Sequence, residues 1–334
     1  MNDSARQSGA GAEVSPGGAR GGVGLPGWEL VCRGAERIGE VFRAASRILR
    51  PAPPRSILPA SEAASPVVPL GAEPVPMRVV ERRVETLDTA TLELRPERGR
   101  DFPRHAAGQF AVVFADVSGV RAARACSITS PPQRLPGIEI AVPVRPGARV
   151  ARHLAHPARV GETLWVSGPF GEFCYRPDRE EEELILVAAG SAVAPCVAMV
   201  EAALAFRRVR RIVLLHVARY ERDLLFRERL EGLARSDGRF RLVLSLTRAS
   251  PAWEGERGRI DAAMIERHVP ASGRRAATWL VCGPRMMCWD VLFALDDLGV
   301  SRERIRSEAF GSPIEPEREL GESRVAEIPD RAAG

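Results

Sequence analysis

The chain has 334 residues, of which 45% are hydrophobic and 27% are charged, so it can bury one large hydrophobic core or two ordinary ones. No stretch approaches the roughly 18–20 uninterrupted apolar residues of a membrane-spanning helix, and the N-terminus lacks the basic region and apolar core of a secretory signal. The net charge is +5, and all 48 basic residues are arginines spread among 43 acidic residues. The lack of a membrane span and of a signal sequence leads us to expect a cytoplasmic protein. Because no basic stripe interleaved with aromatic residues occurs, we expect that it does not bind nucleic acid.

The cysteines give no sign of a metal site or an iron–sulfur cluster. None forms a CxxC pair, and the spacing of the closest two fits no common zinc pattern. The six cysteines are Cys32, Cys126, Cys174, Cys196, Cys282 and Cys288. We therefore expect no metal.

Residues 1–76 differ in composition from the rest of the chain. They begin rich in Gly and Ser and end in a Pro-rich spacer, which predicts a mostly disordered extension. Within it, residues 28–50 carry apolar side chains at alternating spacings of three and four, which indicates one amphipathic helix. This helix either packs on the protein's own body or docks on a partner or a membrane surface.

From residue 77 to residue 178 the chain consists of short extended runs separated by Gly, Pro and Asp turns, which predicts an antiparallel barrel or sandwich. A charged linker follows, and residues 183–310 then alternate strands with helical stretches. That alternation predicts a doubly wound parallel sheet with helices on both faces. Residues 311–334 read as a disordered tail without cysteine. The predicted fold is thus a two-domain α+β and α/β protein.

Two strand ends in the second half are typical of a nucleotide site. "LILVAAGSAVAP" places Gly190 and Ser191 directly after a buried strand and before a helix, where backbone N–H groups and the helix dipole attract a pyrophosphate. "WLVCGPRMM" ends another strand at Cys282, Gly283 and Pro284. Because ligands bind at the carboxyl ends of parallel strands, both segments are candidates for one site.

Five motifs in a fixed order give the chain a family resemblance. They are "GQF" at 108–110, "RACS" at 124–127, "GPFGEF" at 168–173, "GSAVAP" at 190–195 and "CGPRMM" at 282–287, and "SEAF" at 307–310 supports them. In this order the chain resembles the ferredoxin–NADP reductase superfamily, and within it the reductase components of bacterial oxygenases and hydroxylases. The resemblance implies a Greek-key flavin barrel followed by a nucleotide-binding domain. It also implies an NAD(P)H-dependent oxidoreductase that uses FAD or FMN.

The resemblance assigns the flavin contacts. "RACS" resembles the family's flavin motif, in which Arg124 would pair with the flavin phosphate and the Ser127 hydroxyl would approach N5 of the isoalloxazine. The segment "RPGARVARHL" resembles a loop that cradles the pyrophosphate. The remaining residues expected to contact the flavin are Ala125, Cys126, Gly147, Arg149, Val150, Ala151 and Phe310.

The resemblance likewise assigns the nucleotide contacts. Cys282 would lie beside the nicotinamide C4, and Glu308 would sit near the flavin edge and relay protons or meet the acceptor. Thr247 and Arg248, with Arg259 as a third candidate, resemble a stretch that grips a 2′-phosphate; this favours NADPH over NADH. The other expected nucleotide contacts are Gly190, Ser191, Ala192, Gly283, Pro284 and Met287.

Three departures from the family pattern leave a second hypothesis open. Cys126 replaces a Tyr, Ala192 replaces a Gly, and Ala151 replaces a Ser or Thr. A degenerate, non-catalytic binding or regulatory subunit is the alternative to a flavoprotein reductase. In the favoured hypothesis the electron acceptor is a separate ferredoxin-like or oxygenase protein, since the tail carries no iron–sulfur ligands.

Overall fold

The computed structural model describes residues 73–99, 101–117, 120–134, 136–144, 154, 160–178, 182–206 and 208–310. All of them belong to one compact unit, Ala52–Gly334. The helix predicted near residues 28–50 and the tail predicted for residues 311–334 lie outside the described residues. In the part of the chain that the structure describes, no helix is both long and apolar enough to span a bilayer.

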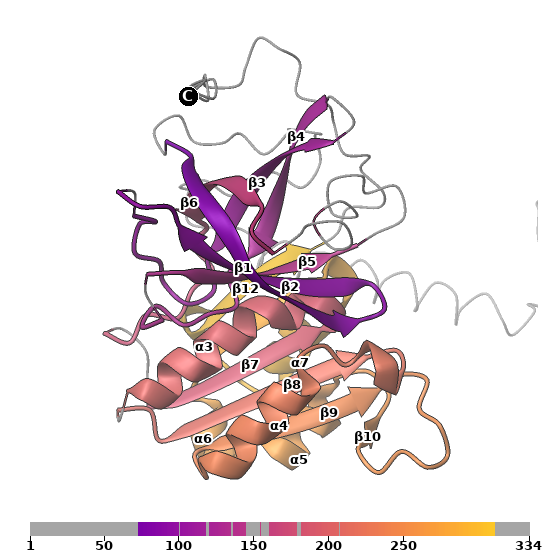
Figure 1. The fold of residues 1–334 in the computed structure, drawn as a ribbon. Coiled ribbons are helices and arrows are strands. Elements are labelled where there is room, and N and C mark those ends of the chain that lie inside the picture. The colour runs from indigo at the N-terminus through magenta and orange to yellow at the C-terminus, as the bar shows by residue number, and fades with distance from the viewer. Residues whose placement is uncertain are drawn as a thin grey trace, which may run out of the picture. The chain divides into compact units, whose positions relative to one another are not determined.

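The first half of the described chain forms a six-stranded antiparallel sheet in the order β4-β3-β6-β1-β2-β5 (Figure 1). Its strands are β1 (Val75–Thr86), β2 (Thr89–Pro96), β3 (Phe110–Val117), β4 (Val120–Ser127), β5 (Ile138–Pro143) and β6 (Thr163–Phe170). An isolated antiparallel bridge between Ile128 and Ile140 joins the end of β4 to β5, which closes the sheet into a barrel.

Alternation along the barrel strands separates core from solvent. In β1, the buried Met77 and Val79 flank the exposed Arg78. Their apolar side chains pack with those of β2, β3 and β5 into one core, as the period of two predicts.

The second half forms a six-stranded parallel sheet in the order β10-β9-β8-β7-β11-β12. Its strands are β7 (Glu183–Ala189), β8 (Arg211–Ala218), β9 (Phe240–Leu246), β10 (Glu256–Arg257), β11 (Thr278–Pro284) and β12 (Ile305–Phe310). The α-helices are α3 (Ala194–Ala205), α4 (Arg227–Ser236), α5 (Ala262–His268), α6 (Ala271–Arg274) and α7 (Arg285–Asp297), and the short 3₁₀ turns are η1 (Gly190–Val193), η2 (Glu221–Asp223) and η3 (Arg302–Arg304).

Both faces of this sheet are covered, which explains its nearly continuous apolar strands. Leu184 and Leu186 of β7 pack on the side of α3 and α4, whereas Ile185 and Val187 pack on the side of α5 and α7. Figure 1 shows α3 and α4 in front of the sheet, with α5 and α7 behind it. The two-domain fold class predicted from the sequence is confirmed.

A shared core joins the barrel to α3. Ala107, Phe173 and Tyr175 of the barrel region are buried in the same cluster as Met199 of α3. The close approach depends on Gly108, because a Cβ at this position would lie 2.2 Å from the Met199 methyl group. The "GQF" motif therefore has a packing role at this contact.

Candidate cofactor site

Three adjacent strands carry the predicted nucleotide residues to one edge of the parallel sheet. Cys282 of β11 is in register with Ala188 of β7 on one side and with Glu308 of β12 on the other. The loop that begins at Gly190 follows β7 directly. Because all three strands run in parallel, their carboxyl ends meet at the same edge. The structure thus brings together three segments that lie far apart in the sequence, at Ala188, Cys282 and Glu308.

The Gly190 loop leaves room for a ligand. Gly190 has φ = 54°, and no atom lies within 4 Å of the position that a Cβ would occupy. Within the described chain, no side chain caps the start of η1 or of α3. Backbone N–H groups at this helix start are suited to a phosphate. Ser191 is half-buried in the same turn.

Ala192, one of the three departures, fits its place. It lies in η1, its side chain is buried in the core beneath α3, and it is not among the residues with positive φ. The only described non-glycine residue with positive φ is Phe226. An alanine at position 192 therefore strains neither the backbone nor the open side of the loop.

Buried sulfur surrounds the end of β11. Burial raises the pKa of the Cys282 thiol well above its ordinary value, and the nearby Cys196, Glu308 and Cys288 act in the same direction. The Cys288 thiol donates to the Gly283 carbonyl at 3.5 Å and to the Glu308 carbonyl at 3.7 Å. Cys282 is therefore a neutral contact group at neutral pH, not a thiolate nucleophile.

Gly283 and Met287 are in contact at the start of α7. A Cβ on Gly283 would lie 2.1 Å from the Met287 methyl group and 3.3 Å from the Ala189 Cβ. Only glycine allows this approach without displacement. Pro284 follows as an exposed residue that ends β11 and immediately precedes α7.

Glu308 of β12 places a carboxyl group at the same edge of the parallel sheet, beside Cys282. Burial raises its pKa from 4.5 to about 7. No ion pair joins Glu308 to a basic side chain among the residues that the structure describes. A carboxyl with this pKa exchanges protons near neutral pH. Phe310, two residues further along β12, is half-buried against the core beneath α3.

On the barrel side, the "RACS" segment is the last part of β4. Arg124 is half-buried and donates from Nη2 to the Pro143 carbonyl at 3.2 Å. Ala125 is exposed and Ser127 is half-buried, in register with Phe110 of β3. Cys126 is 2% exposed within the barrel core, and burial raises its pKa to about 11. The cysteine thus fills core volume as a neutral thiol.

Four predicted flavin residues cannot be placed. Gly147, Arg149, Val150 and Ala151 lie outside the described residues.

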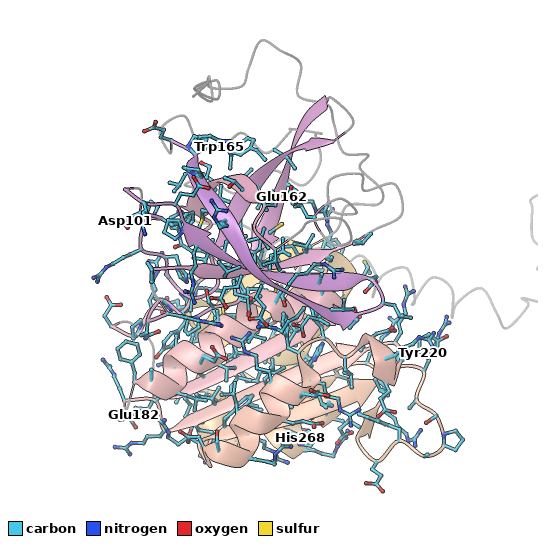
Figure 2. All side chains as sticks on the ribbon, viewed as in Figure 1. Asp101, Glu162, Trp165, Glu182, Tyr220 and His268 are labelled. Carbon is cyan, nitrogen blue, oxygen red and sulfur yellow. The ribbon has the colours of Figure 1, made fainter. Side chains whose placement is uncertain are left out.

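Two of the predicted 2′-phosphate residues, Thr247 and Arg248, directly follow β9 and lie beside the end of β8. Thr247 and Arg248 are exposed, and their N–H groups donate to the carbonyls of Ala218 and Arg219, which aligns the two strand ends. The Arg248 guanidinium donates to the Tyr220 hydroxyl at 2.9 Å. Figure 2 labels Tyr220 at this edge of the sheet.

Tyr220 and Arg222 were missed by sequence reasoning. The guanidinium carbons of Arg222 and Arg248 lie 4.5 Å and 5.7 Å from the centre of the Tyr220 ring, which makes a cationic cluster. The signal that could have found them is their position, directly after β8 and beside the end of β9. The third candidate, Arg259, forms an ion pair with Asp290, with 4.0 Å between Nη1 and Oδ2.

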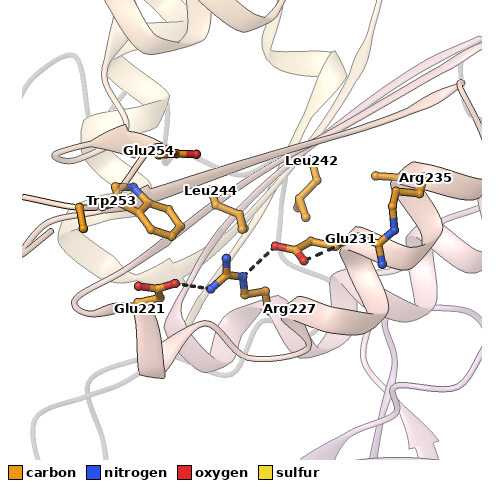
Figure 3. A pocket seen from close by; sticks show the side chains of 11 residues that line it. Glu221, Arg227, Glu231, Arg235, Leu242, Leu244, Trp253 and Glu254 are labelled. Atoms are coloured by element: carbon orange, nitrogen blue, oxygen red, sulfur yellow. Dashed lines mark hydrogen bonds and ion pairs between the residues drawn. The ribbon is translucent and has the colours of Figure 1, made fainter. Parts of the chain in front are cut away.

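A separate cavity of about 570 Å³ lies beside α4 (Figure 3). Trp253, Leu242 and Leu244 supply its apolar wall, and Arg227 bridges Glu221 and Glu231 across it. None of the predicted site residues lines this cavity.

Comparison with known proteins identifies the two halves. Residues 76–175 match the oxidoreductase FAD-binding domain family, and residues 186–292 match the oxidoreductase NAD-binding domain family. Over 245 residues the chain is 34% identical to ferredoxin–NADP reductase B of Sorangium cellulosum, covering 72% of this chain and 98% of that protein. The chain belongs to the ferredoxin–NADP reductase family. It is an NAD(P)H-dependent oxidoreductase whose cofactors are FAD and NAD(P)H.

Other relatives of this reductase include subunits of oxygenase systems. It is 28% identical over 230 residues to the glycine betaine monooxygenase reductase subunit of Pseudomonas aeruginosa, covering 67% of this chain and 62% of that protein. Among solved structures, a cytochrome P450 reductase of Amycolatopsis matches with a TM-score of 0.61 and 26% identity over 71% of this chain and 69% of that chain. The fold resembles that of the FAD/NAD-binding domain of a Vibrio cholerae nitric oxide dioxygenase, with a TM-score of 0.64, 21% identity, and coverage of 72% of this chain and all of that chain.

The residues of this reductase fit both cofactors. The open space at Gly190 and the uncapped helix start leave room for a pyrophosphate, and Arg124 and Ser127 place a guanidinium group and a hydroxyl at the end of β4. Cys126 and Ala192, which motivated the non-catalytic alternative, are both accommodated in cores. The resemblance to reductases predicted from the motifs is confirmed.

Proposed function

We propose that this reductase passes electrons from NADPH through FAD to a separate ferredoxin-like or oxygenase protein. The observation that carries the proposal is the alignment of Ala188, Cys282 and Glu308 at one sheet edge, directly beside the Gly190 loop. The glycine betaine monooxygenase reductase subunit and the Amycolatopsis cytochrome P450 reductase, which the chain resembles, support a protein acceptor.

We also propose that each half of the chain binds one of the two cofactors. Residues 77–178 would hold FAD, and residues 183–310 would hold NAD(P)H. Bound FAD supplies the ability to accept an electron pair as hydride and to release the electrons singly. Arg124 and Ser127 would bind the flavin, while the Gly190 loop would bind the nucleotide pyrophosphate. Contact of residues 28–50 with a partner or a membrane surface stays a prediction.

The residues of the sheet edge have separate tasks. Cys282, neutral and fully buried at the end of β11, would lie beneath the nicotinamide and keep water out of the core behind it. Glu308 would hold or release a proton at its carboxyl oxygen, since burial places its pKa at about 7. Catalysis would come mainly from holding the two rings together, because the cofactors carry the redox chemistry.

A preference for NADPH follows from the cluster at the ends of β8 and β9. Arg248 is exposed and ordered by its hydrogen bond to the Tyr220 hydroxyl, and Arg222 stacks on the same ring. Two guanidinium groups beside one aromatic ring suit a 2′-phosphate and a stacked adenine. NADH carries no 2′-phosphate for these two guanidinium groups to bind.

The test uses purified full-length protein under anaerobic conditions. We expect it to be yellow, to lose its visible absorbance on addition of NADPH, and to reduce both ferricyanide and a [2Fe–2S] ferredoxin. Reduction of ferricyanide without any reduction of ferredoxin or of an oxygenase component would contradict the proposed acceptor. Equal efficiency with NADH and NADPH would contradict the proposed donor.

A further inference from the structure

Arg229 of α4 links the nucleotide-binding half of the protein to the barrel. Its Nε and Nη2 atoms donate to both carboxylate oxygens of Glu201 on α3, at 2.6 Å and 2.9 Å. Its Nη1 atom donates to Glu139 Oε1 on β5 at 2.6 Å, and Nη2 also reaches the Thr129 carbonyl at 3.3 Å. One guanidinium thus ties two helices of the parallel-sheet half to two segments of the barrel.

Glu139 is the buried end of this link. Its side chain is 0% exposed, and it also accepts hydrogen bonds from the Thr129 hydroxyl, at 2.6 Å, and from Arg83. Burial raises the pKa of Glu139, but the charge of Arg229 and the hydrogen bond from Thr129 outweigh burial and hold the pKa below its usual value. Arg229 likewise keeps its charge: burial opposes it, but the hydrogen bond to Glu201 and the charge of Glu139 raise its pKa. Arg229 and Glu139 are therefore both ionised, and both charged groups are largely shielded from water.

The barrel residues of the link adjoin the flavin segment. Thr129 lies two residues after Ser127, and its N–H donates to the Glu139 carbonyl at 2.8 Å. The Ser130 hydroxyl accepts from the Glu139 N–H at 2.9 Å. At the other end of the link, Glu201 belongs to α3, the helix that follows the Gly190 loop. Arg229 therefore connects the strand end of the flavin motif to the helix of the nucleotide site.

We propose that Arg229 is a positioning residue, which fixes the nucleotide-binding half against the barrel and so sets the rate of hydride transfer without setting the affinity for NADPH. This inference rests on the proposed function. The groups expected to bind the nucleotide all lie in the parallel-sheet half, so they survive the loss of Arg229. The separation of the two rings depends on the contact between the halves, and a displacement of about 1 Å lowers a rate by about 100-fold.

Arg227 provides a matched control on the same helix. It donates to Glu221 at 2.5 Å and to Glu231 at 2.7 Å, both within the parallel-sheet half (Figure 3). Replacing it removes one arginine and two ion pairs, as replacing Arg229 does, but leaves the barrel contact intact.

The experiment compares R229Q, R227Q, R229K and E139Q as full-length holoproteins with the wild type. Single-turnover reduction by NADPH gives the limiting hydride-transfer rate and the nucleotide dissociation constant separately. We expect R229Q to lower the limiting rate by about tenfold or more while leaving the dissociation constant within about twofold, and R227Q to change neither. R229K, which keeps a charge that reaches one carboxylate, should give an intermediate rate.

A second readout does not depend on turnover. Hydrogen exchange at the Thr129 amide, measured on the holoproteins without NADPH, should accelerate in R229Q and E139Q and stay unchanged in R227Q. Equal rates in R229Q and R227Q, or a loss confined to NADPH affinity, would overturn the inference. A wild-type protein that NADPH does not reduce would overturn the proposed function and this inference together. If NADPH reduces the wild type, either of the two outcomes just named overturns the inference alone.

Discussion

Replacing Glu308 with Gln should change how stability depends on pH. Burial raises the pKa of this carboxyl from 4.5 to about 7 in the folded protein. At about 1.4 kcal/mol for each pH unit, this difference corresponds to about 3 kcal/mol. Because the folded pKa lies above the unfolded one, the stabilising contribution is complete below pH 4.5 and is lost as the pH rises to 7.

The variant E308Q should therefore gain stability relative to the wild type as the pH rises. The difference in the free energy of unfolding should grow by up to about 3 kcal/mol between pH 4.5 and pH 8. Denaturant unfolding followed by tryptophan fluorescence at several pH values, with a fixed excess of FAD, measures it. E303Q removes an exposed carboxylate from η3 and serves as the control. If the E308Q and E303Q differences from wild type vary equally with pH, the reasoning about burial is refuted.

Three further substitutions test other parts of the structure. In steady-state kinetics, R248A should raise KM for NADPH by about tenfold or more and leave KM for NADH nearly unchanged. The reason is that it removes the charge-assisted contact proposed between the guanidinium, held by Tyr220, and the 2′-phosphate. Equal changes for both donors would argue against the 2′-phosphate site. G190A places a methyl group in the open space of the loop at φ = 54°, so NADPH affinity should fall by about tenfold, while the free energy of unfolding falls by only about 1–2 kcal/mol. G108A should destabilise the fold by about 3 kcal/mol or more in denaturant unfolding, because its Cβ would lie 2.2 Å from the Met199 methyl group and 2.5 Å from the Phe173 carbonyl oxygen. The added change M199A should recover only part of that loss, since the backbone contact remains.

The convergence of the nucleotide segments could be predicted from the sequence. Gly190 and Cys282 each end a buried strand in a βα pattern, and the rule that parallel strands meet at their carboxyl ends places them together. Register was not needed for that inference. It was needed for Glu308, whose position beside Cys282 depends on β12 adding to the outer edge of β11.

The contacts that join distant arginines could not be predicted. The chain holds 48 arginines, so no local signal shows that Arg229 contacts Glu139, 90 residues away. The same holds for the stacking of Arg248 on Tyr220. The first pairing depends on how the two sheets meet and the second on how the loops after β8 and β9 lie, and spacing along the sequence records neither.

The effect of the departures from the family pattern could not be predicted from the sequence either. A motif comparison shows only that Cys126 replaces a Tyr and that Ala192 replaces a Gly. In the structure Cys126 lies in the barrel core and Ala192 packs beneath α3. Whether a substitution weakens a site depends on the direction of its side chain, which a motif does not record.

The central claim is that the barrel and the parallel sheet together hold a flavin that NADPH reduces. The visible absorption spectrum of the purified full-length protein, recorded anaerobically before and after one equivalent of NADPH, tests it most directly. We expect a flavin spectrum whose released chromophore is FAD and whose visible bands bleach on mixing. A colourless protein that does not take up FAD on reconstitution, or a bound flavin that NADPH leaves oxidised, would contradict the account.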